Sequence, residues 1–116
     1  MLALHPEHLA VAYDFLRKLP PYKGWKLPPV EEVKFRVANR QDAVQGEYIF
    51  RDGAHRIMIS GRHVGHLDTL IRIMAHEMVH LAQEESGQAN SFQHNADFKR
   101  RALRVSKLLG FDPRNF

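Results

Sequence analysis

The chain has 116 residues, of which 44% are hydrophobic and 26% charged, as in a globular domain with one modest core. It has no cysteine, which excludes disulfides and thiolate metal sites, and it has neither a signal-peptide pattern nor an apolar run long enough to cross a membrane. The net charge of +4 is mildly basic, so we expect a single domain over residues 1–116 with a cytoplasmic location and no membrane partner.

The first half of the chain predicts one helix followed by three strands. Apolar residues recur at helical spacing from Pro6 to Leu19, just before a Pro-Pro pair. Val33–Val37 alternates apolar and polar residues, which indicates a strand. Glu47–Phe50 and His55–Ser60 flank Asp52-Gly53, a dipeptide typical of tight hairpin turns. We expect Ile57–Ser60 to be an edge strand that can pair with an extended peptide.

The second half predicts two helices. Leu70, Met74, Met78 and Leu81 recur at helical spacing, with Asp68 or Thr69 as the N-cap, and Ser91 can cap a further helix. The whole order predicts an α+β fold. We expect an N-terminal helix, a small three-stranded antiparallel-rich sheet, a helix that carries the motif described next, and a C-terminal helix.

The sequence His76-Glu77-Met78-Val79-His80 lies inside the first of these two helices. Side chains four residues apart share one face of a helix, so the two imidazoles can bind a single Zn²⁺. Glu77 then flanks the metal and can take a proton from a water molecule without being a ligand. The alternative is two surface histidines on an ordinary helix.

Catalytic zinc usually has three protein ligands, so a third is expected downstream. The metzincin pattern requires Gly at position 83 and His at position 86, but the chain has Gln83 and Ser86, and no Glu follows Glu85. His94 is the best candidate, because Ser91 would place it in the first turn of a helix that returns towards the motif. Asp97 is the second candidate, and the alternative for His94 is an exposed residue at a helix start.

At these residues the chain resembles the SprT-like family, which includes the Spartan-type DNA-dependent proteases. The shared pattern is an H-E-M-x-H helix followed by His-(Gly/Asn)-x-x-(Phe/Trp), here His94 to Phe98, and the resemblance is strongest over residues 46–110. It implies a single minimal zincin-like metallopeptidase domain, with His76, His80 and His94 as zinc ligands and Glu77 as general base. Asn95 replaces the commoner Gly, and the family's frequent cysteine zinc ribbon is absent, which weakens any inference of DNA dependence.

Two further groups of residues bear on function. Lys99, Arg100, Arg104 and Lys107 lie on the predicted last helix and form either a DNA-contacting stripe or the solvated half of an amphipathic helix. One of three histidines upstream of the motif could stabilise an oxyanion, but we expect all three to be strand and loop residues without a catalytic part: His55, His63 and His66.

Together these patterns predict a zinc-dependent endopeptidase in which Glu77 is the catalytic base, with protein or peptide substrates that include DNA-associated proteins. The alternative is a non-catalytic, zinc-stabilised module that binds DNA or protein, because a small domain can use a metal to supplement its core.

Overall fold

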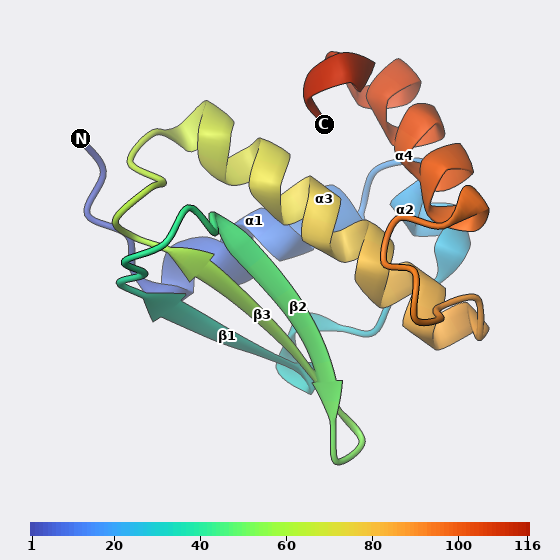
Figure 1. The fold of residues 1–116 in the computed structure, drawn as a ribbon, viewed down its shortest axis with the longest axis horizontal. Coiled ribbons are helices and arrows are strands. Elements are labelled where there is room, and N and C mark those ends of the chain that lie inside the picture. Colours follow the sequence, from blue (N-terminus) through green and yellow to red (C-terminus); the bar gives the residue numbers. More distant parts are fainter.

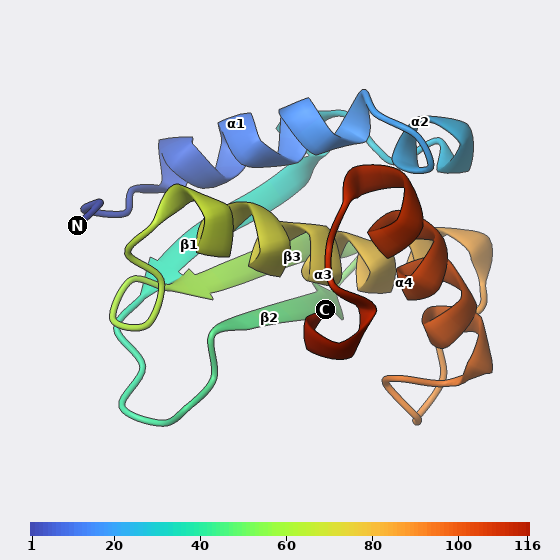
Figure 2. The same ribbon diagram turned by 90° about the horizontal axis from the view of Figure 1, so that it is seen from above.

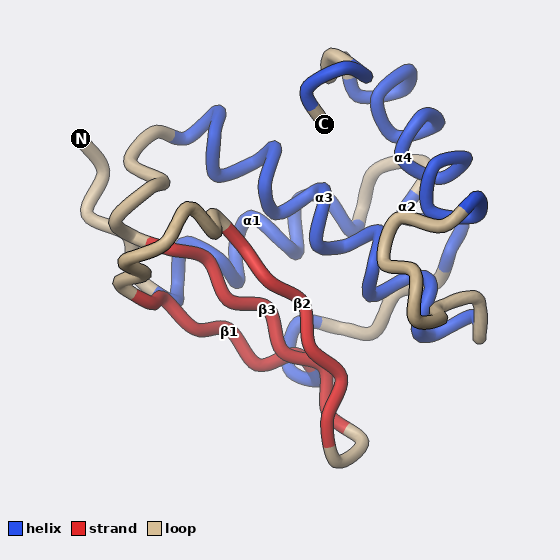
Figure 3. The backbone as a smooth tube through the Cα atoms, viewed as in Figure 1, coloured by secondary structure: helices blue, strands red, loops and turns tan.

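Four helices and one three-stranded sheet make up the fold, which confirms the predicted α+β class (Figures 1 and 3). The computed structural model describes residues 1–116. None of its helices combines the length and the apolar character that crossing a membrane requires. In chain order the elements are α1 (Pro6–Arg17), α2 (Tyr22–Trp25), β1 (Val33–Ala38), β2 (Gly46–Arg51), β3 (Ala54–Ser60), α3 (Leu67–Ser86) and α4 (Ala96–Leu109), with short 3-10 helices at Val30–Glu32 and Pro113–Asn115.

The sheet is mixed, with strand order β1-β3-β2. β1 pairs with β3 in parallel, whereas β2 pairs with β3 antiparallel, so only one of the two pairings has the antiparallel character that we expected. Because β3 is the central strand, the prediction that Ile57–Ser60 forms an edge was wrong. The hairpin partner β2 is an edge strand instead, and one side of its backbone remains free to pair.

The hairpin between β2 and β3 follows the predicted turn. Asp52 and Gly53 both have positive φ, at 54° and 75°, which is the backbone conformation of a type I′ turn. Glycine adopts this region without steric penalty, and aspartate tolerates it better than most residues. The turn therefore fixes the register that pairs Tyr48 with Ile57.

Helices α1 and α3 cover the same face of the sheet, α1 over β1 and α3 over β2 and β3 (Figure 2). Side chains alternate along each strand, so Val33 and Ile57 are buried towards the helices. The short helix α2, which the periodicity did not reveal, is hydrogen-bonded to α3. The buried Tyr22 hydroxyl donates a 2.6 Å hydrogen bond to the carbonyl oxygen of Ala75 in α3.

Two helix starts differ from the predictions. α3 begins at Leu67 with His66 as its N-cap, and not after Asp68 or Thr69. α4 begins at Ala96, because Asn95 and not Ser91 is the N-cap. The side chain of Asn95 accepts a 2.9 Å hydrogen bond from the backbone N–H of Phe98, and the chain before it is a loop.

Candidate metal centre

Helix α3 presents His76 and His80 side by side on its half-buried face. The opposite face of the helix carries Met74, Met78 and Leu81, which are fully buried in the core and therefore fix how α3 is rotated. With that rotation set, residues four apart point the same way. The two imidazole ring centroids lie 5.2 Å apart.

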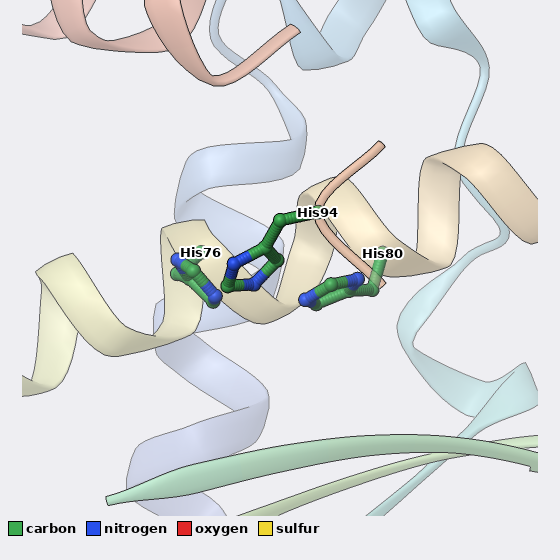
Figure 4. A group of neighbouring side chains, drawn as sticks. All are labelled: His76, His80 and His94. Atoms are coloured by element: carbon green, nitrogen blue, oxygen red, sulfur yellow. The ribbon is translucent and has the colours of Figure 1, made fainter. Parts of the chain in front are cut away.

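His94 approaches the same point from the loop between α3 and α4 (Figure 4). Its ring centroid lies 5.1 Å from that of His76 and 5.3 Å from that of His80. Each of the three histidines has a ring nitrogen within 4.8 Å of those of the other two. The sequence therefore identified a set of histidines that the fold brings together, although His94 precedes helix α4 and does not lie in its first turn. The ring of Phe98 stacks on His80 and His94, with centroids at 4.5 and 4.4 Å.

The donor set fits a tetrahedral metal ion such as Zn²⁺. Three imidazole nitrogens bound to zinc at about 2.0–2.1 Å lie about 3.4 Å from one another and leave the fourth position open. In the structure the ring nitrogens lie within 4.8 Å of one another, and His94 is the exposed member of the three. The Nδ1 atom of His76 is 3.2 Å from the carbonyl oxygen of Phe116. In metal sites a contact of this kind, made by the ring nitrogen that does not bind the metal, orients the imidazole.

The electrostatic environment keeps two of these imidazoles neutral, as metal ligands must be. Burial, together with the nearby His94, lowers the pKa of His76 to about 4. Burial and the two neighbouring imidazoles lower the pKa of His80 to about 3. At neutral pH both rings therefore offer a free nitrogen lone pair without first losing a proton.

Glu77 lies beside the histidines and is only 6% exposed. Burial, and to a lesser extent the nearby Glu47, raise the pKa of its carboxyl group to about 8, although the Tyr48 backbone N–H lowers it in part. The facing position on β2 is Gly46, where an added Cβ would lie 3.2 Å from Glu77 Oε2 and 2.6 Å from Ile73 Cγ2. The strand can therefore approach the carboxylate closely only because this position has no side chain.

A cleft of about 440 Å³ opens above these residues. One wall comes from the β2 region, the floor from α3, and the other wall from the loop before α4. Besides the three histidines, the lining includes Gly46, Glu47, Tyr48, Glu77, Gln83 and Glu84. The free edge of β2 thus borders the cleft that contains the histidine cluster.

The model of the SprT-like family matches residues 14–115, which is most of the chain. The chain belongs to the SprT-like family. No curated protein matches it. Family membership and the histidine cluster together fit a metalloprotease-like domain, and the matched region extends beyond residues 46–110 to include α2 and the sheet.

The other candidate ligand in this SprT-like chain does not join the cluster. The carboxylate of Asp97 instead accepts hydrogen bonds from Gln83, at 3.0 Å, and from Arg101, at 2.8 Å. Burial opposes its ionisation, but these two hydrogen bonds lower the pKa of Asp97 below its ordinary value. Asp97 therefore helps to anchor α4 and is not part of the histidine cluster.

The three upstream histidines also lie outside the cleft lining. His55 is buried in β3, where it is hydrogen-bonded to the Tyr48 hydroxyl and to Glu85. His63 is hydrogen-bonded to the backbone carbonyl oxygen of Asp42, and His66 is the N-cap residue of α3, where its side chain makes no capping hydrogen bond. These positions agree with the expectation that the three are strand and loop residues of the SprT-like fold.

Sequence reasoning missed two residues that shape the site. Gly46 gave no signal, because a single glycine at a strand start is unremarkable until the opposing helix is known. Gln83 was noted only because it breaks the metzincin pattern, yet it is buried and lines the cleft. Its position three residues after His80 was the available clue, since residues three apart lie on neighbouring parts of one helix face.

Proposed function

We propose that this SprT-like protein is a zinc-dependent endopeptidase with His76, His80 and His94 as the metal ligands and Glu77 as the general base. One observation carries the proposal: three imidazole nitrogens converge within 4.8 Å beside a buried carboxylate in an open cleft. A purely structural zinc site is closed by four ligands and has no use for the carboxylate.

When bound, a zinc ion would supply Lewis acidity that activates a water molecule and polarises the scissile carbonyl group. Glu77 then accepts the proton of the attacking water and transfers it to the amine that leaves. Its burial favours this role, because a general base is most efficient when its pKa is close to the operating pH, and burial raises the pKa of Glu77 from its ordinary acidic value to about 8. The neutral His76 and His80 remain ligands throughout and move no proton.

The free edge of β2 is the proposed binding site for the substrate backbone. An extended peptide can add to an open sheet edge by main-chain hydrogen bonds, and this edge borders the cleft beside Glu77. The cleft lining includes the half-buried carboxylates of Glu47 and Glu84 but no lysine or arginine. We therefore propose that neutral or basic peptide segments bind better than acidic ones.

DNA-associated proteins are the proposed substrates, with DNA held along α4. The side chains of Lys99, Arg100, Arg104 and Lys107 are exposed, and of these only Arg100 forms an ion pair, at 3.4 Å with Asp97. Helix α4 starts two residues after His94, so a phosphate backbone on this face would hold bound proteins near the cleft. Charge reversal at Arg104 and Lys107 should weaken DNA binding and reduce its salt dependence.

Metal analysis of protein purified without an affinity tag is the first test, with one zinc per chain expected. Glu77→Gln should keep the zinc and lose hydrolysis of an unstructured basic protein, whereas His94→Ala should lose both. Full activity in the Glu77→Gln protein would contradict the assigned base. Stoichiometric zinc without proteolysis, in the presence or absence of DNA, would instead favour the non-catalytic zinc-stabilised module.

A further inference from the structure

The loop that carries His94 is attached to α3 through one buried side chain, Gln83. Its amide nitrogen donates a 2.8 Å hydrogen bond to Asn95 Oδ1 and a 3.0 Å hydrogen bond to Asp97 Oδ2. Gln83 is 2% exposed, so water does not compete with these bonds. A primary amide has two N–H donors, and both are used.

Each of the two acceptors fixes a different part of the chain around His94. Asn95 also caps α4 through the Phe98 N–H, and its own amide nitrogen donates a 3.1 Å bond to the carbonyl oxygen of Gln88. Asp97 is held in addition by Arg101. Gln83 therefore joins the beginning of the loop, its end and the first turn of α4 to the helix that carries the other two histidines.

His94 itself has no comparable attachment. It forms no hydrogen bond through its ring, and residues 88–94 are all exposed. Apart from contacts between its ring and those of Phe98, His76 and His80, its position depends on Asn95, its immediate neighbour in the chain. The hydrogen bonds of Gln83 thus set where the third imidazole lies relative to His76 and His80.

We propose that Gln83 is a positioning residue that holds His94 in place for the metal ion, an inference that rests on the proposed metal centre. Fixing the loop in advance reduces the conformational entropy that metal binding would otherwise cost. Loss of groups that orient metal ligands typically weakens metal affinity by about 10- to 100-fold, and we expect a loss in this range for Gln83.

The test uses Gln83→Met, which keeps the length and packing of the side chain but removes both N–H donors. Ser106→Ala is the matched control, because Ser106 is equally buried and its hydroxyl bonds only to Ala102 within α4. Zinc affinity is measured for the full chain by competition with a chromogenic chelator, at a temperature where every metal-free variant is folded. Amide hydrogen exchange of residues 88–95 is followed in the same metal-free proteins.

Gln83→Met should bind zinc at least about tenfold more weakly than the wild type and exchange faster in this loop, whereas Ser106→Ala should match the wild type in both. A variant that only loses thermal stability, with unchanged zinc affinity, would overturn the proposal. If Gln83→Met does not fold, Asn95→Ser serves instead. The shorter serine side chain can still cap α4, but it cannot make both hydrogen bonds of the Asn95 amide, the one from Gln83 and the one to the Gln88 carbonyl oxygen. Failure of the wild type to bind zinc would refute the metal centre itself, which is a separate result.

Discussion

Substitution of Gly46 by alanine is expected to destabilise the protein, because β2 lies against α3 with no room for a side chain. The new Cβ would lie 2.6 Å from Ile73 Cγ2, whereas ordinary contacts start at 3.4 Å. Either the strand moves outwards by nearly 1 Å or Ile73 changes its rotamer. Overpacking of this kind costs about 1–3 kcal/mol. The lower conformational entropy of the unfolded alanine variant offsets about 0.4–1 kcal/mol of that cost.

The net loss of about 1–2 kcal/mol should lower the Tm by roughly 4–8 °C, as measured by circular dichroism. Gly24→Ala is the control, since nothing lies within 4 Å of a Cβ at that position, and its Tm should not fall. Ile73→Ala removes the opposing methyl group, so the double variant should be more stable than the two single losses imply. A Gly46→Ala protein as stable as the wild type, or strict additivity in this cycle, would refute the reasoning.

Three other predictions follow from the structure. Asp97→Asn should lower the free energy of unfolding at neutral pH, because the native pKa of Asp97 is depressed. The stability contributed by the ionised carboxylate is present above the unfolded pKa of 3.8 and is lost as the pH falls. Wild-type and variant urea curves should therefore converge in acid and not in base. Gly53→Val should cost about 1–3 kcal/mol, because a β-branched residue is strained at φ 75°, and urea unfolding that is unchanged would contradict the turn assignment. Zinc at about 100 times its Kd should raise the free energy of unfolding by about 2.7 kcal/mol, a gain that EDTA should abolish.

The parts of the fold that local sequence determines were predictable. The period of apolar residues located α1 and α3, and Asp52-Gly53 located the hairpin, because backbone conformation there depends on adjacent residues. Strand order was not predictable in the same way. The alternation in Val33–Val37 shows that one face of β1 is buried, but it does not say which strand will be its neighbour or in which direction.

The same distinction between local and tertiary determinants applies to the site. His76, Glu77 and His80 are related by helix geometry alone, so their spacing in the sequence gave their arrangement in space. The start of α4 depended on a tertiary interaction, because Ser91 and Asn95 are both good N-cap residues. The hydrogen bond from Gln83 engages Asn95, and no local pattern contains that information.

The exposed edge of β2 has a consequence for handling the protein. Unpaired strand edges also invite self-association, and charged side chains usually discourage it. Here two copies aligned antiparallel about Ile49 would place Glu47 of each opposite Arg51 of the other, so these charges attract and do not repel. Concentrated samples should therefore be prone to edge-to-edge pairing that excludes peptide, and a bound peptide should keep the protein monomeric.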